Sequence, residues 1–79
     1  MEMTGDEIAA ARREMGLSRR QLGALLGYKG GRETFKSLRL VETGERNMAA
    51  DLQERLGRLH AYWKRYRRFP PAEVIDGEA

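Results

Sequence analysis

The sequence predicts an all-α fold, a compact domain of four to five helices that contains a helix-turn-helix and has a long C-terminal helix. Three observations lead to this prediction. Apolar residues recur at helical spacing in four stretches. Two capping motifs mark helix starts, and glycines follow the last periodic residues, where helices end. A chain of 79 residues supports one such domain with a modest core.

Two capping motifs, each followed by a closing glycine, predict the first two helices. In each motif a hydroxyl and a Glu or Gln side chain three residues later bind each other's free backbone N–H groups. The motifs and their glycines are Thr4 with Glu7 and Gly16, and Ser18 with Gln21 and Gly27. The first helix is expected over residues 5 to 15, and the second begins directly after it. Such a short connection containing glycine is one signature of a helix-turn-helix.

The third predicted helix ends at Thr43-Gly44 and has two different sides. The apolar residues on one side step by three: Phe35, Leu38 and Val41. The residues on the other side are charged or polar: Arg32, Glu33, Lys36, Ser37 and Arg39.

The polar side of this helix has the chemistry of base contacts in DNA. Arg32, Lys36 and Arg39 are at positions i, i+4 and i+7, so they share a face about two turns long that fits a major groove. Arginine and lysine donate to guanine edges, Glu33 can accept from a cytosine amino group, and Ser37 can bind a base or a phosphate. The alternative is an ordinary solvated helix face.

Two further pairs of residues are candidates for phosphate contacts. Arg19 and Arg20 stand at the start of the second helix, where backbone donors and positive side chains together can hold a phosphate. Arg46 and Asn47 lie in the loop after the third helix and have the same chemistry. Because Asn47 is also expected to cap the fourth helix, the structural and the functional interpretation of this loop both stay open.

The fourth helix is expected to run from Asn47 to a stop before Pro70-Pro71. Its apolar residues form a heptad seam: Leu52, Leu56, Leu59, Trp63 and Tyr66. We assign Leu52 and Leu56 to the core of the domain. The candidates for a dimer interface, with packing inside the chain as the alternative, are Leu59, Tyr62, Trp63 and Tyr66.

The end of this helix alternates basic and aromatic residues. The basic ones are Lys64, Arg65, Arg67 and Arg68. They are expected on the polar side of a dimer helix, and the alternative is binding of phosphate or single-stranded RNA by stacking. Beyond them the helical periodicity stops. We therefore divide the chain into a helix-turn-helix domain with a C-terminal dimerisation helix, residues 1–69, and a flexible tail, residues 70–79.

The composition narrows the classes of function. Lys and Arg outnumber Asp and Glu by 15 to 12, a net charge of +3, which favours a polyanionic partner. Without cysteine the chain has neither a disulfide framework nor a thiolate metal site, and with one histidine it has no His cluster. No apolar run has the length of a signal peptide or membrane span, so a cytoplasmic protein is expected. No pair of nucleophile and base and no phosphate-binding loop can be assembled, so an enzyme is not expected.

The order of two motifs resembles a known family. The segment "SRRQLGALLG", followed by a helix that ends in "LVETGER", is similar to the repressor and Cro-type helix-turn-helix proteins, the Xre family. The matching positions are Leu22, Gly23, Leu26, Gly27, Val41, Glu42, Gly44 and Arg46. The chain departs from the family pattern in having extra residues within "YKGGRET".

The resemblance implies a transcriptional regulator without a cofactor. Such proteins bind double-stranded DNA as homodimers at palindromic operators, and small ones repress their own promoters in phages, in antitoxin systems and beside anti-CRISPR genes. The resemblance also implies a partly buried ion pair between Arg12 and Glu42. The alternative is a protein-interaction module on the same scaffold, in which the fourth helix binds an unidentified protein partner.

Overall fold

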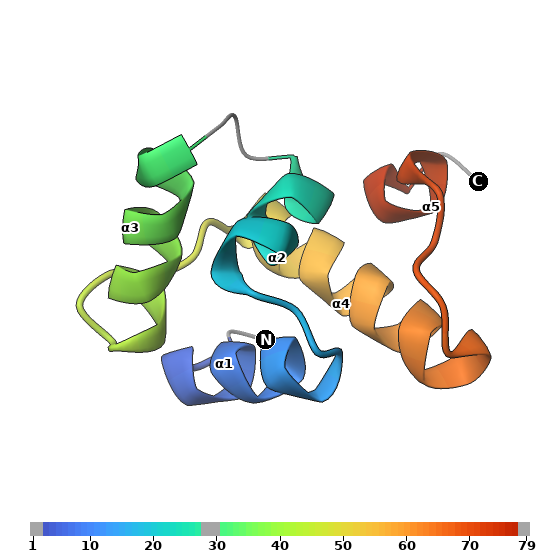
Figure 1. Cartoon of the computed structure of the whole chain (residues 1–79), viewed down its shortest axis with the longest axis horizontal. Helices are drawn as coiled ribbons and strands as arrows, with labels where there is room; N and C mark the ends of the chain where they lie inside the picture. Colours follow the sequence, from blue (N-terminus) through green and yellow to red (C-terminus); the bar gives the residue numbers. More distant parts are fainter. Residues whose placement is uncertain (1–2, 28–30, 78–79) are drawn as a thin grey trace.

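The computed structural model describes residues 3–27 and 31–77, except for the side chains of residues 31–35. Outside its loops this part of the chain is helical (Figure 1). The helices are α1 (Gly5–Glu14), α2 (Arg19–Leu26), α3 (Gly31–Glu42), α4 (Ala50–Tyr66) and α5 (Ala72–Asp76). The consecutive helices α2 and α3 pack on each other, and α4 is the long helix near the C-terminus. The predicted all-α class is confirmed.

Both predicted capping boxes are present. At α1, the Glu7 N–H donates to Thr4 Oγ1 at 3.1 Å, and the Thr4 N–H donates to Glu7 Oε1 at 2.9 Å. At α2, the Gln21 N–H donates to Ser18 Oγ at 3.1 Å, and the Ser18 N–H donates to Gln21 Oε1 at 2.8 Å. The hydrogen bond with the Thr4 backbone, and to a smaller extent the one with the Thr4 side chain, lower the pKa of the Glu7 carboxyl. Both helices therefore begin where the local sequence predicts.

One hydrophobic core joins all five helices. Its buried members are Ile8, Ala11, Met15, Leu17, Leu22, Leu26, Leu38, Val41, Met48, Leu56, Leu59 and Ile75. Helix α3 packs against α1 and α2, whereas α5 packs against α2 and α4. Leu56 is fully buried in this core as predicted, and Leu52 packs against it half-buried. The side chain of Phe35, predicted for the apolar side of α3, lies outside the described part.

The burial of Leu59 contradicts its predicted place in a dimer interface. Its side chain is 0% exposed, because it lies three residues after Leu56 on the same side of α4 and meets the same core. A side chain with no exposed surface in one copy cannot contact a second copy. Of the other interface candidates, Tyr62 and Trp63 are half-buried and Tyr66 is exposed.

Helix α4 is shorter than the sequence predicts at both ends. Asn47 does not cap it, since the residue before its first turn is Ala49, which makes no side-chain hydrogen bond. Met48 is buried in the core, and its carbonyl accepts a bond from the Gln53 side chain at 2.9 Å, which holds this loop segment outside the helix. At the other end, Arg67 adopts a left-handed backbone with φ of 55°, which ends the helix after Tyr66.

The predicted flexible tail is wrong for residues 70–77, which form part of the domain. Residues 72–76 are helix α5, and Ile75 is 3% exposed within the core. A single buried isoleucine creates no helical periodicity, which is why the pattern does not reveal this helix. Residues 78–79 lie outside the described part.

Two arginines of α4 hold the ends of neighbouring helices. Arg58 Nε donates to the Ile75 carbonyl at 2.7 Å, at the end of α5. Arg55 Nη1 donates to the Leu26 carbonyl at 3.0 Å, at the end of α2, and lies 3.3 Å from Asp76 Oδ1. Positive side chains are favourable at helix C-termini, where carbonyls lack partners within the helix.

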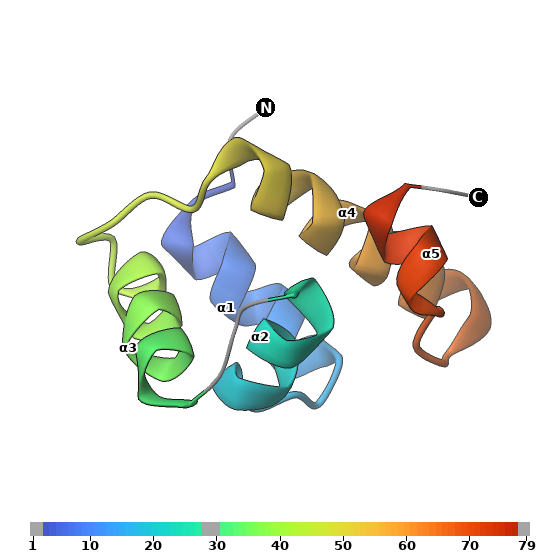
Figure 2. The same ribbon diagram turned by 90° about the horizontal axis from the view of Figure 1, so that it is seen from above.

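The molecule is 32 Å along its longest axis. Helix α3 lies at one end of this axis, and the C-terminal end of α4 lies at the other (Figures 1 and 2). Surfaces on these two elements can therefore have different partners. Within the described ranges, no helix has both the length and the apolar character needed to cross a membrane.

Candidate nucleic-acid interface

Helix α3 turns one side to the core and the other to solvent. Leu38 and Val41 are 0% and 3% exposed, as their spacing predicts. Lys36 and Arg39 are exposed. Within the part of the chain that the structure describes, neither of these two cations has an ion-pair partner. Both are therefore available to an acceptor outside the protein.

The other predicted base contacts on α3 have different outcomes. Arg32 and Glu33 belong to the helix, but their side chains lie outside the described part. Ser37 is half-buried, and its Oγ accepts a hydrogen bond from Arg46 Nη1 at 3.2 Å. Because Arg46 comes from the loop after α3, a predicted phosphate contact lies directly beside a predicted base contact.

The C-terminus of α3 is closed by a Schellman motif around Gly44. The Gly44 N–H donates to the Val41 carbonyl at 3.1 Å, and the Glu45 N–H donates to the Leu40 carbonyl at 2.9 Å. Gly44 has φ of +86°, a left-handed conformation that costs a glycine little. The predicted stop is confirmed, and it fixes where the loop that carries Arg46 begins.

A buried charge network fixes the end of α3 to α1 and α2. Arg12 Nε and Nη2 donate to Glu42 Oε2 and Oε1 at 2.7 and 3.0 Å, which confirms the expected pair. Arg12 Nη1 also donates to the Leu17 carbonyl at 3.0 Å, and Arg19 Nε donates to Glu42 Oε1 at 3.1 Å. Burial raises the pKa of Glu42, but the hydrogen bonds and charges of Arg12 and Arg19 outweigh it and lower that pKa.

This network changes the interpretation of the predicted phosphate contacts. Arg19 was expected to hold phosphate, but its Nε is bound to Glu42 and its side chain is only 27% exposed. Its Nε therefore makes a structural contact, because Glu42 accepts hydrogen bonds from both arginines. Arg20 is exposed in the first turn of α2, and Asn47 is exposed in the loop after α3. These two keep the exposure that a phosphate contact requires.

The N-terminus of α1 lies directly against the C-terminus of α3. A Cβ atom at Gly5 would collide with the Val41 carbonyl oxygen and would come within 2.8 Å of the Glu42 carbonyl oxygen. The positive end of one helix dipole thus meets the negative end of the other, which is favourable. Together with the Arg12–Glu42 pair, this approach holds α3 at two neighbouring points.

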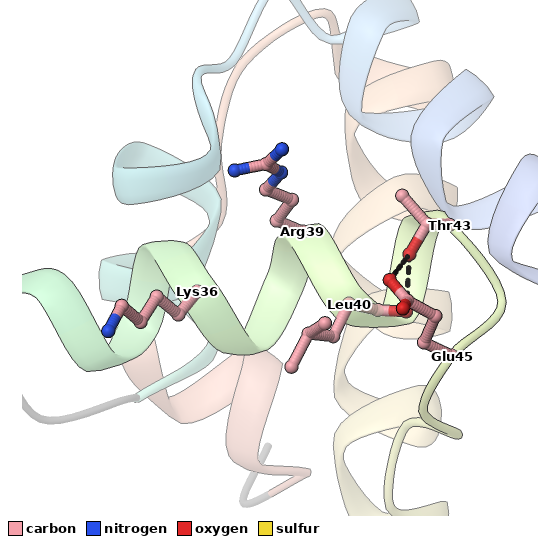
Figure 3. A pocket seen from close by; sticks show the side chains of 5 residues that line it. All are labelled: Lys36, Arg39, Leu40, Thr43 and Glu45. Atoms are coloured by element: carbon pink, nitrogen blue, oxygen red, sulfur yellow. Dashed lines mark hydrogen bonds between the residues drawn. The ribbon is translucent and has the colours of Figure 1, made fainter.

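A groove of about 360 Å³ runs along the exposed side of α3 (Figure 3). It is lined by Lys36, Arg39, Leu40, Thr43 and Glu45. Thr43 Oγ1 lies 2.9 Å from Glu45 Oε2 and 3.1 Å from the Leu40 carbonyl oxygen, and the two acceptors share its single proton. The end of the groove opposite Thr43 carries the ammonium group of Lys36 (Figure 3). The groove thus combines cationic, apolar and acidic groups on one helix face.

Three of these groove residues were not among the sequence candidates. Leu40, Thr43 and Glu45 belong to the "LVETGE" segment, which we interpreted as the end of the helix rather than as part of its exposed face. Leu40 and Thr43 are four and seven residues after Lys36, so continuing the same helical row would have found them.

Among the residues that the structure describes, no three His, Asp or Glu side chains form a group able to hold a metal ion. Comparison with protein-family models, with curated proteins and with solved structures found no match for this chain. The interpretation of the site therefore rests on its own geometry.

Proposed function

We propose that this protein is a sequence-specific double-stranded DNA-binding regulator that represses its own promoter, with α3 as its recognition helix. The observation that carries the proposal is the exposure of Lys36 and Arg39 on a helix whose other side is buried and whose end is fixed by Glu42. A recognition helix has to present donors to base edges from a rigid support, and α3 has both properties.

The residues around α3 divide into two kinds of DNA contact. Lys36 and Arg39 are suited to guanine edges, and half-buried Leu40 is suited to a thymine methyl group. Arg46, Asn47 and Arg20 are suited to phosphates, because they lie in the loop after α3 and in the first turn of α2. Base contacts give specificity in this division, and phosphate contacts give most of the affinity.

The proposal includes two copies on one operator. Each copy supplies one recognition helix, so a palindrome requires two, with the helices about 34 Å apart across one turn of duplex. The stoichiometry on DNA and the length of the protected site test this part separately from base recognition.

The main experiment compares binding to a duplex from directly upstream of the gene with binding to a scrambled duplex, over a range of salt concentrations. Lys36→Ala or Arg39→Ala is expected to cost about 1–3 kcal/mol on the specific duplex and to relax specificity. Arg20→Ala and Arg46→Ala are expected to lower the affinity for both duplexes alike. Each should also reduce the slope of log affinity against log salt concentration by about one.

Lys64→Ala is the matched control, because it removes one exposed positive charge from the last turn of α4, the helix whose C-terminal end lies far from α3 (Figure 1). It should leave the preference between the two duplexes unchanged. Equal and steeply salt-dependent binding to both duplexes by the unmodified protein would contradict a sequence-specific regulator. If Lys36→Ala and Arg39→Ala both bind DNA like the unmodified protein, α3 is not the recognition helix.

A further inference from the structure

The C-terminal end of α4 carries a second exposed surface, far from α3 (Figures 1 and 2). We call it the aromatic–arginine surface and define it by Trp63, Arg65, Tyr66, Arg67, Arg68 and Phe69. Over residues 62–69 the chain has four basic residues and no acidic one. The charge of this surface is therefore strongly positive.

The arginines of this surface are held on aromatic rings. The guanidinium of Arg67 lies 4.6 Å from the centre of the Trp63 ring, and those of Arg65 and Arg68 lie 5.5 and 5.8 Å from the centre of the Tyr66 ring. Trp63 itself packs against the hydrophobic core, so its ring is a fixed support. An arginine that is already stacked loses less conformational freedom when it binds an anion.

The same surface exposes apolar area. Tyr66 is 49% exposed and Phe69 is 41% exposed, and they are the exposed large hydrophobic side chains of the part that the structure describes. Water-exposed rings beside arginines have the composition of protein interfaces, in which Trp, Tyr and Arg dominate the binding energy. The partner should therefore cover the rings as well as neutralise the charge.

Two kinds of partner satisfy only part of these requirements. A second copy that docks the same surface would bring three arginines against three others, which is repulsive. A nucleic acid would neutralise the charge. However, guanidinium groups already lie over the rings of Trp63 and Tyr66, where bases would stack, which leaves Phe69 as the one ring of this surface open to a base.

We propose that the aromatic–arginine surface binds an acidic protein segment that carries apolar side chains. Its carboxylates pair with Arg65 and Arg68, and its apolar side chains cover Phe69 and the part of Tyr66 that the guanidinium groups leave exposed. This binding does not depend on α3 or on DNA, because the two surfaces lie at opposite ends of the molecule (Figure 1).

The test uses the full chain, with its single tryptophan, Trp63, as the reporter. The probe is a synthetic amphipathic peptide of Asp, Glu, Leu and Phe, and binding is followed by tryptophan fluorescence and by calorimetry. Saturable binding is expected, and Arg68→Ala and Phe69→Ser should each weaken it by about threefold to tenfold. Arg13→Ala, which removes an exposed positive charge from α1, is the matched control and should bind normally.

Two altered peptides separate charge from apolar contact. One replaces Leu and Phe by Ser, the other replaces Asp and Glu by Lys, and neither should bind. Equal binding of the serine peptide would mean simple charge attraction and would overturn the proposal. Failure of the original peptide to bind would overturn it as well.

The remaining outcomes assign the surface to another occupant. Displacement of the peptide by duplex DNA or single-stranded RNA, with an affinity that Arg68→Ala lowers, would assign it to nucleic acid. Self-association of the free protein that Phe69→Ser abolishes would assign it to a second copy. Either result overturns the proposal. Lys36→Ala should leave peptide binding unchanged, so this test and the DNA test can fail independently.

Discussion

Arg12 and Glu42, 30 residues apart in the chain, are joined by two side-chain hydrogen bonds of 2.7 and 3.0 Å in the protein interior. The pair connects the first helix to the last residue of α3, so the orientation of the proposed recognition helix depends on it. Arg12 is 9% exposed and Glu42 is 8% exposed. Removing one charge of such a pair leaves the other buried without its partner.

Glu42→Gln is therefore expected to lower the free energy of unfolding by about 3 kcal/mol, measured by urea denaturation at neutral pH. The control is Glu14→Gln, because the Glu14 side chain is 47% exposed and pairs with His60 at the surface. That variant should lose less than about 1 kcal/mol. Similar losses in both variants would show that burial of the Arg12–Glu42 pair has no special effect on stability.

The pH dependence of stability should reflect protonation of the Glu42 carboxylate. Burial raises the pKa of Glu42, the two arginines lower it more, and the result lies below 4.5. A carboxyl with a lowered pKa in the folded state stabilises the protein above its unfolded pKa. That stabilisation is lost as the pH falls through the folded value. The stability difference between the unmodified protein and Glu42→Gln should thus be constant near neutrality and shrink below about pH 4.5. A difference that stays constant through this range would contradict the lowered pKa.

Replacing two glycines by alanine should change the stability of the protein in opposite directions. Gly44 has φ of +86° with open space around it, so Gly44→Ala introduces backbone strain alone and should cost about 1–2 kcal/mol. Gly57 lies inside α4, also with open space, so Gly57→Ala should stabilise the protein by about 0.5–1 kcal/mol. Thermal unfolding of the two variants gives the signs directly. A stabilising effect of Gly44→Ala would rule out the left-handed stop of α3.

The packing of α5 can be tested at two adjacent residues. Ile75 is 3% exposed, so Ile75→Ala should cost about 2–5 kcal/mol, whereas Val74→Ala, at a half-buried position, should cost clearly less. Urea denaturation of both variants measures the difference. If Ile75→Ala had no effect, residues 70–77 would behave as the flexible tail that the sequence predicts.

Features set by neighbouring residues could be predicted from the sequence. The capping boxes at Thr4 and Ser18 and the stop at Gly44 depend on residues within about one helical turn, so their patterns are readable in the chain. The Arg12–Glu42 pair is a distant contact, and the resemblance to a family, not the spacing of the residues, led to its prediction. The sides of α3 followed from the step of three between Leu38 and Val41.

Features set by packing between distant elements could not be predicted. A heptad seam has the same sequence pattern whether it packs on the core of its own chain or on a second copy. The pattern therefore predicts the wrong contact for Leu59, which is buried in its own core. Asn47 is a good capping residue, but the burial of Met48 decides where α4 begins. The engagement of Arg19 with Glu42 depends on how α2 meets α3, which no local pattern encodes.

Leu56, Leu59 and Ile75 complete the core from the last third of the chain. Since synthesis proceeds from the N-terminus, α3 leaves the ribosome before these residues, which bury its supporting helices. The products of interrupted translation therefore carry Lys36 and Arg39 on a segment without a completed core. A chain that ends before Leu56 should show no cooperative unfolding transition by circular dichroism. Only finished chains are then expected to hold α3 rigidly.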